Sequence, residues 1–153
     1  MPVRMPHRAP ARALPAPPAA RWLQAAAAFL VLAAAALYAA SALAGPHAQE
    51  AKKHARVALQ HAQEALDAGP GDPRGIAMHG SAAIDHAEEA LRHAREDYRQ
   101  TRNRHVKAFI DHTEEGVEHM REAVALARRG KGNPAMRHAR EAMRHLREGF
   151  RHL

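Results

Sequence analysis

The chain contains no cysteine, and this absence excludes several classes of protein at once. Without thiols there is no disulfide framework, no thiolate nucleophile and no thiolate metal site. Aromatic residues are also scarce, with one Trp, two Tyr and three Phe in 153 residues. A chain of this length allows one modest domain.

Recognisable catalytic arrangements are missing as well. No nucleophile–base set, phosphate loop or buried acid pair can be assembled from the sequence, so we expect no enzyme. The net charge of +7 and the pI near 10.7 would favour nucleic acid or a membrane surface as partner. The arginines, however, are scattered among acids, and no aromatic platform lies between them for base stacking. We therefore expect no nucleic-acid binding.

The first 44 residues contain no acidic residue. They carry Arg4, Arg8, Arg12 and Arg21, and then the apolar run WLQAAAAFLVLAAAALYAASALA, which ends at Ala44. A basic leader, an apolar stretch and an A-x-A site are the three parts of a secretory signal peptide. We expect residues 1–44 to be a signal peptide cleaved after Ala44. An uncleaved membrane anchor is the alternative, because the run is about as long as a spanning helix.

Removal of the leader lowers the expected net charge of the protein. Without its four arginines, the remaining 19 of the 23 basic residues face 16 acidic ones, a net charge of +3. Cleavage of the leader predicts a secreted domain, residues 45–153, with no stable membrane association. No cysteine follows the apolar run, which excludes a lipoprotein anchor.

The remaining residues predict an all-α domain. Ala, Glu, Arg, Leu and Gln dominate, and glycine and proline cluster in AGPGDP and GKGNP. In the first cluster Gly69 is a stop signal, Asp72 an N-cap and Pro73 a first helical residue; Gly130, Asn133 and Pro134 repeat this pattern. A weaker break is expected at RQTRN, residues 99–103, where Thr101 and Asn103 are possible caps. We predict an antiparallel up-and-down four-helix bundle with helices at 46–68, 73–99, 103–129 and 134–152.

Histidine is the residue in excess, with 13 in the chain. Apart from His7 in the leader, the histidines form four trios with a strict spacing of seven, one trio for each predicted helix: His47, His54 and His61; His79, His86 and His93; His105, His112 and His119; His138, His145 and His152. A period of seven keeps a residue on one helix face. The four helices are therefore repeats of one unit.

The other heptad positions follow once each histidine is labelled a. Position d is acidic at eight places and lacks acid at Val57, Ala82 and Ala108. Positions f and b are mainly apolar, so this seam is predicted to be the buried stripe, and Met120, Met136 and Met143 on it are predicted to fill the core. Position e is small in most heptads and lies between the seam and the histidines. The histidines are thus predicted to lie on the shoulder of the core.

Imidazole and carboxylate groups three or four residues apart on a helix are neighbours, and both can reach one cation. Successive histidines of one helix are about 10.5 Å apart and cannot share an ion. No HExxH, HxxxH or HxxH pair occurs, so further ligands must come from water or from a second helix. We expect histidine stripes to face each other across two grooves. The sequence leaves open which helices pair.

The repeats HAQEALDAG, IDHAEEALRHARE, FIDHTEEGVEHMREA and MRHAREAMRHLREG resemble the helices of the small metal-binding protein family, over essentially all of residues 47–152. That family consists of histidine-rich periplasmic four-helix bundles that bind several divalent ions, notably Cu(II). The resemblance implies metal buffering or scavenging outside the cytoplasm, with a part in copper tolerance or supply. This chain departs from the family in its higher arginine content and in the three positions d without acid.

Neutral imidazole with carboxylate suits Cu(II), Ni(II) and Zn(II), and copper heads the affinity order. We therefore expect a monomer that binds divalent metal ions, Cu(II) first, with Ni(II) or Zn(II) as alternatives, and that passes them to an unidentified receiving protein. The predicted ligands are all twelve histidines of residues 45–153 together with Glu50, Glu89, Glu115, Glu141 and Glu148. The alternative is a pH-responsive interaction protein, since protonation of twelve histidines would raise the charge toward +15 and favour anionic partners.

Overall fold

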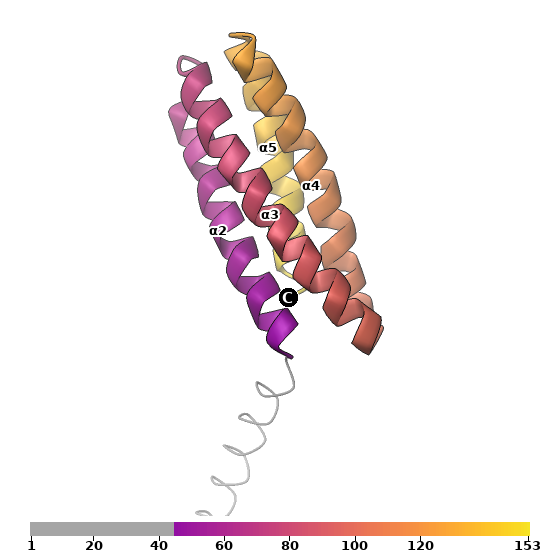
Figure 1. The fold of residues 1–153 in the computed structure, drawn as a ribbon. Helices are drawn as coiled ribbons and strands as arrows, with labels where there is room; N and C mark the ends of the chain where they lie inside the picture. The colour runs from indigo at the N-terminus through magenta and orange to yellow at the C-terminus, as the bar shows by residue number, and fades with distance from the viewer. Residues whose placement is uncertain (1–44) are drawn as a thin grey trace, which may run out of the picture. The chain divides into compact units, whose positions relative to one another are not determined.

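The computed structural model describes residues 45–153, and the predicted signal peptide lies outside these residues. Four helices follow one another: α2 (Pro46–Ala68), α3 (Pro73–Thr101), α4 (Arg104–Arg128) and α5 (Gly132–Phe150). They form an up-and-down bundle in which α2 packs mainly on α3 and α4 mainly on α5 (Figure 1). The prediction of an all-α four-helix bundle is confirmed. None of the helices in this part of the chain has an apolar stretch long enough to cross a membrane.

The helix ends are set by caps that the sequence largely predicts. Asp72 is the N-cap of α3, and its carboxylate accepts a hydrogen bond of 2.9 Å from the amide of Gly75. Asn103 caps α4 in the same way through the amide of His105, also at 2.9 Å. These bonds satisfy amides that the first helical turn leaves without partners. The weak break predicted near residue 103 is therefore a real helix boundary.

The start of α5 differs from the prediction. The helix begins at Gly132 rather than Pro134, and its N-cap is Lys131, whose side chain makes no capping bond. Asn133 is not the cap, and Pro134 lies inside the first turn, where a missing amide hydrogen costs nothing. A Cβ atom on Gly132 would lie 1.9 Å from the carbonyl oxygen of Pro70, so the backbone of α5 begins in direct contact with the α2–α3 loop. This loop-to-loop contact sets the start of the helix.

The core is centred closer to the histidines than the sequence indicates. The predicted b positions are buried, and Met120, Met136 and Met143 do fill the core. Several f residues are only half-buried: Leu59, Leu66, Ile84 and Phe150. By contrast, the alanines at position e are at most 1% exposed: Ala51, Ala58, Ala65, Ala83, Ala90, Ala123 and Ala142. Position e is thus part of the core centre, and the buried stripe is wider than the predicted f and b positions.

Small residues at position e allow the paired helices to approach closely. A Cβ atom on Gly116 of α4 would lie 2.9 Å from two side-chain carbons of Leu146 on α5. One on Gly149 would lie 2.9 Å from the hydroxyl oxygen of Thr113. Such contacts are tighter than normal van der Waals packing, so these positions need glycine. The close approach brings the flanking a positions of the two helices together.

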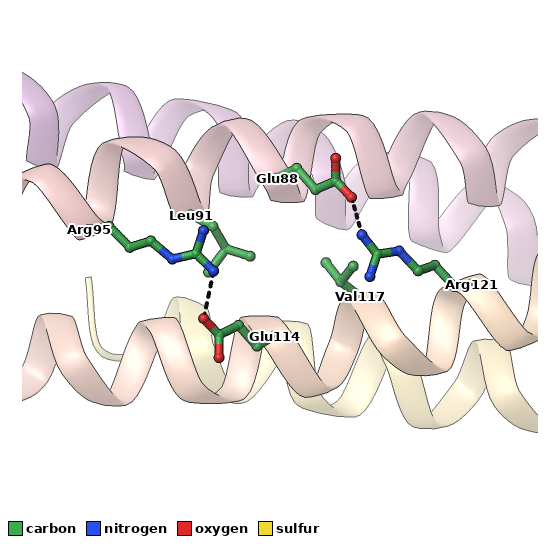
Figure 2. A pocket seen from close by; sticks show the side chains of 6 residues that line it. All are labelled: Glu88, Leu91, Arg95, Glu114, Val117 and Arg121. Atoms are coloured by element: carbon green, nitrogen blue, oxygen red, sulfur yellow. Dashed lines mark hydrogen bonds and ion pairs between the residues drawn. The ribbon is translucent and has the colours of Figure 1, made fainter.

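The α3–α4 interface is built differently. Arg95 of α3 pairs with Glu114 of α4 at 2.8 Å, and Arg121 of α4 pairs with Glu88 of α3 (Figure 2). Leu91 and Val117 lie between the two ion pairs, and no histidine lines this groove. All four charged side chains are about half exposed, so each pair contributes little to stability. The histidines belong instead to the α2–α3 and α4–α5 interfaces.

Candidate metal centre

The twelve histidines form two continuous ladders. The first ladder consists of His47, His54 and His61 from α2 and His79, His86 and His93 from α3, and the second of His105, His112 and His119 from α4 and His138, His145 and His152 from α5. Eleven of the twelve side chains are half-buried, and His105 is exposed. The predictions of two facing stripes and of a shoulder position are both confirmed, and the structure settles which helices pair.

Because the paired helices are antiparallel, their histidines interleave. In the first ladder the imidazoles follow the order 47, 93, 54, 86, 61, 79, with neighbouring ring centroids 5.4 to 6.4 Å apart. In the second ladder the order is 105, 152, 112, 145, 119, 138, with separations of 5.4 to 6.3 Å. The wide spacing along one helix is therefore filled by the partner helix. Two imidazoles from different helices can share an ion.

The closest approaches in the first ladder are between ring nitrogens. The Nδ1 atoms of His47 and His93 are 3.1 Å apart, and those of His54 and His86 are 3.3 Å apart. Metal–imidazole bonds are about 2.0–2.1 Å long, so such a pair fits two ligands on one ion at an angle of about 100°. The geometry suits tetrahedral or square arrangements. Each pair takes one ligand from α2 and one from α3.

Three groups of side chains add a carboxylate to two imidazoles. In each group the donor atoms lie within 4.8 Å of one another, and each contains histidines from two helices: His61, Glu64 and His79; His112, Glu115 and His145; His54, Glu89 and His93. We call them the Glu64 group, the Glu115 group and the Glu89 group. With three protein ligands and room for water, each is an open site of the kind that divalent metals use in proteins.

The Glu64 group is the most completely formed. Oε2 of Glu64 lies 2.7 Å from Nδ1 of His61 and 3.0 Å from Nδ1 of His79. The other oxygen, Oε1, accepts a hydrogen bond of 3.1 Å from the amide of Gln60. This bond and the bond to His61 hold the pKa of Glu64 below its usual value. The carboxylate is thus charged and fixed, with one oxygen directed at both imidazoles.

The Glu115 group contains buried nitrogen atoms without hydrogen bonds. Oε2 of Glu115 lies 2.6 Å from Nδ1 of His145 and 4.0 Å from Nδ1 of His112. Despite the short distance to His145, neither Nδ1 atom has a hydrogen bond with any part of residues 45–153, although both are buried. A buried polar atom without a partner costs free energy. A bound cation would satisfy both nitrogens, so the donor set fits a metal ion.

The Glu89 group contains an arginine contact. Arg92 donates hydrogen bonds to Glu89 Oε2 through Nε, at 3.0 Å, and through Nη2. Its Nη2 atom is also 3.4 Å from Nε2 of His93. These bonds lower the pKa of Glu89, so the carboxylate is charged, but it is occupied by the guanidinium. An ion at this group must compete with Arg92.

The predicted glutamates have different surroundings. Glu89 and Glu115 lie in three-residue groups, and Glu50 lies 4.0 Å from Nε2 of His54. Glu141 pairs with Arg144 at 3.0 Å, and Glu148 pairs with Arg151 at 2.8 Å. None of these contacts tests metal binding itself, which stays a prediction for every one of these residues.

Glu64 was missed as a ligand, although it occupies position d three residues after His61. The sequence signal that could have identified Glu64 is the residue three positions after it. Glu89, Glu141 and Glu148 also occupy position d, and each is followed three residues later by an arginine that pairs with it. Glu64 is followed by Asp67 instead. No neighbouring cation on its own helix competes for its carboxylate.

Two histidines that have no acid at position d, three residues later, receive one from the partner helix. His79, whose position d is Ala82, contacts Glu64 of α2. His54, whose position d is Val57, shares a group with Glu89 of α3. His86 lies three residues before Glu89 but is not in this group of three. The axial offset between the two helices places each of these carboxylates close to a histidine of the partner helix.

Two ring environments favour the neutral imidazole that metals bind. Burial lowers the pKa of His93 and of His145, and a preceding guanidinium, from Arg92 or Arg144, lowers each further. Their other charged neighbours are His47, His54 and Glu50 around His93, and Glu115, His112 and His119 around His145. Metal binding requires deprotonated imidazole, so burial prepares these two rings for a cation, whereas the guanidinium beside each ring opposes one.

We predict that the metal-free protein loses stability on acidification from about pH 7.5 to about pH 5. His93 and His145 have lowered pKa values in the folded state, so unfolded chains take up their protons first. Their contribution to stability is present above the unfolded pKa of about 6.5 and is lost as the pH falls through the folded pKa. Thermal unfolding in a chelator, followed by circular dichroism, should give a falling midpoint. An increased midpoint would contradict the assignment, and the variant His145→Gln should reduce the slope.

Comparisons with known proteins give a match to the sequence model of a family. No curated protein and no solved structure matches it. The sequence model of one family, described as small metal-binding protein, matches residues 21–149, well over half of the chain and all four helices except the end of α5. That match agrees with the interleaved imidazoles and the three carboxylate-containing groups. The chain belongs to the small metal-binding protein family.

Proposed function

We propose that this protein binds several divalent transition-metal ions, copper(II) first, and buffers or scavenges them in the periplasm. The observation that carries the proposal is the set of three groups in which two helices each contribute a histidine and one contributes a glutamate. Family membership supports metal binding in general. The identity of the metal, the location and the role in metal tolerance are our inferences from ligand chemistry and from the leader.

The geometry favours reversible binding over catalysis. Each group offers three ligands in a half-exposed groove between two helices, so water can complete the coordination. The ligands are imidazole and carboxylate, without thiolate, which suits Cu(II) best among the available divalent ions. Soft Cu(I) would prefer sulfur, and the methionines at 120, 136 and 143 are buried in the core. The protein then acts as a monomeric, non-enzymatic store from which a receiving protein takes its metal.

The alternative is a pH-responsive binder of anionic partners. That function would require most of the twelve imidazoles to be protonated together. Neighbouring rings in each ladder are 5.4 to 6.4 Å apart, so adjacent imidazolium ions would repel one another. The lowered pKa values of His93 and His145 act in the same direction. The ladder geometry therefore supports the metal function over the alternative.

Calorimetric titration with Cu(II), Ni(II) and Zn(II) tests the proposal, using protein purified after expression of the full chain. We expect binding of more than one ion at neutral pH, tightest for Cu(II). Acidification to about pH 5 should release the metal, because protons compete for imidazole. No binding of any of the three ions at neutral pH would overturn the proposal. Binding of anionic partners that increases in acid without metal would favour the alternative.

A further inference from the structure

The residue directly before each histidine differs sharply between the three groups. In the Glu64 group, the residues before His61 and His79 are the neutral Gln60 and Met78. In the Glu89 group, Lys53 precedes His54 and Arg92 precedes His93. In the Glu115 group, Arg144 precedes His145, and Asp111, which pairs with Lys107, precedes His112. These residues occupy position g, and the two arginines lie three residues after an acidic position d, Glu89 or Glu141. A side chain at g can therefore contact both the preceding glutamate and the following histidine.

Both arginines contact the preceding glutamate and the following histidine, but they engage different numbers of metal ligands. Arg92 binds the carboxylate of Glu89 and also approaches Nε2 of His93 at 3.4 Å. Arg144 binds Glu141 and lies 2.7 Å from Nε2 of His145, but it does not contact Glu115. Two ligands of the Glu89 group are therefore engaged by a guanidinium, and one ligand of the Glu115 group is.

No arginine of residues 45–153 contacts the Glu64 group. Glu64 is held by Gln60, His61 and His79, and the residue three positions later is Asp67, whose carboxylate accepts a hydrogen bond of 2.8 Å from Gln63. A dication entering this group displaces no charge-assisted hydrogen bond from arginine. The guanidinium of Arg147 is held nearby, but it donates to Oε1 of Gln63 at 3.0 Å and not to a ligand of the group. The free energy of binding is therefore most favourable here.

The end of the first ladder that contains His47 is lined by several arginines, unlike the Glu64 group at the other end. A pocket there is lined by His47, His93 and Glu96 together with Arg92, Arg95 and Arg99. Arg99 also pairs with Glu96 at 2.7 Å. Three guanidinium groups beside two imidazoles raise the local potential and disfavour a dication. The two ends of one ladder thus differ in charge although their histidines are equivalent.

We propose that the arginines at position g set the order in which the groups take up metal: the Glu64 group first, the Glu115 group second and the Glu89 group last. This inference rests on the proposed metal-binding function. Arg92 and Arg144 act as competing cations that raise the metal concentration at which their groups fill. The protein then combines one ready site with sites that respond only to higher metal levels, as a buffer with a wide working range requires.

Nuclear magnetic resonance can follow the order of filling, because Cu(II) broadens the amide signals near each bound ion. With less than one equivalent of Cu(II), signals around His61 and His79 should disappear before those around His112 and His145, and those around His93 last. Initial broadening around His93, or broadening of all three regions together, would overturn the order. Absence of any broadening would contradict the metal function itself.

Two reciprocal variants test the role of arginine. Arg92→Gln removes the competing cation, and we expect about tenfold tighter Cu(II) binding at the Glu89 group, from the Coulomb energy of unit and double charges about 6 Å apart in water. Arg121→Gln is the matched control, since Arg121 pairs with Glu88 across the α3–α4 groove, which no histidine of residues 45–153 lines (Figure 2). Asp67→Arg places a guanidinium three residues after Glu64 and should weaken the first site about tenfold.

The outcomes separate the two proposals. If wild-type protein binds Cu(II) and all three variants bind it with the same affinities and order, arginine does not control filling, and the metal function stands. If Arg121→Gln changes binding as much as Arg92→Gln does, the effect is one of overall charge, which also overturns the inference. If Asp67→Arg moves the first broadening away from His61 and His79 while the circular dichroism spectrum is unchanged, position g sets the order.

Discussion

Replacing both His112 and His145 with alanine should abolish one Cu(II) binding step, with affinity at that site reduced at least about a hundredfold. The reason is that two of the three ligands in the Glu115 group are lost, and Glu115 alone is an exposed carboxylate. Even removal of residues that only orient metal ligands costs 10–100-fold in affinity, so loss of the ligands themselves costs more. Calorimetric titration of wild type and variant measures the difference directly.

The same double variant should remain folded. The Nδ1 atoms of His112 and His145 are buried without hydrogen bonds, so their removal relieves a cost to the folded state. This gain offsets part of the packing lost when two half-buried rings are truncated. We expect the helical circular dichroism to persist and the melting midpoint of the metal-free protein to change by a few degrees. Collapse of the helices would mean that these rings belong to the core.

The control removes the same number of histidines from the same ladder. His105 and His152 are neighbours at 6.1 Å between ring centroids, yet neither lies in a carboxylate-containing group of the described bundle. Alanine at both positions should leave the Glu115 step intact. Equal losses in the two double variants would indicate that the ladders bind ions through imidazoles alone, without preference for the groups that contain glutamate.

Much of the fold follows from the sequence because local chemistry sets it. Gly69, Asp72 and Asn103 act through their own backbone angles or capping bonds, and all three lie at the predicted helix ends. The start of α5 could not be predicted in this way. Gly132 is placed by the carbonyl of Pro70, a residue 62 positions earlier in the chain, and no local pattern encodes that contact.

In the candidate site, too, the features that depend on one helix can be predicted, and those that depend on two helices cannot. The period of seven predicts the histidine stripes, because register on one helix is a local property. Which carboxylate reaches which imidazole depends on the stagger between two helices, as the contact between Glu64 and His79 demonstrates. The stagger depends in turn on the small e residues that pack at the interface. Sequence reasoning from one helix alone therefore cannot find the contact of Glu64 with His79, and Glu64 is absent from the predicted ligands.

Phe109→Ala should produce the largest loss of stability in the bundle. Phe109 is 1% exposed and is a bulky side chain at position e, where most heptads have alanine or glycine. Gly149 of α5 faces it, since a Cβ atom there would lie 3.3 Å from the carbonyl oxygen of Phe109. Alanine at 109 leaves a cavity that rigid helices cannot close. Such truncations cost about 3–5 kcal/mol, which corresponds to a fall in melting midpoint on the order of 15 °C.

Phe150→Ala is the matched control, because it removes the same side chain from a half-buried f position. Its cost should be clearly smaller, and equal losses would contradict the finding that position e lies at the core centre. Cu(II) provides a second readout for Phe109→Ala. Each filled site adds about 2.7 kcal/mol of stability at a free metal concentration one hundred times its dissociation constant. Metal should therefore restore much of the lost midpoint if the ladders still assemble, because the same interfaces that bury Phe109 and Gly149 bring the histidines together.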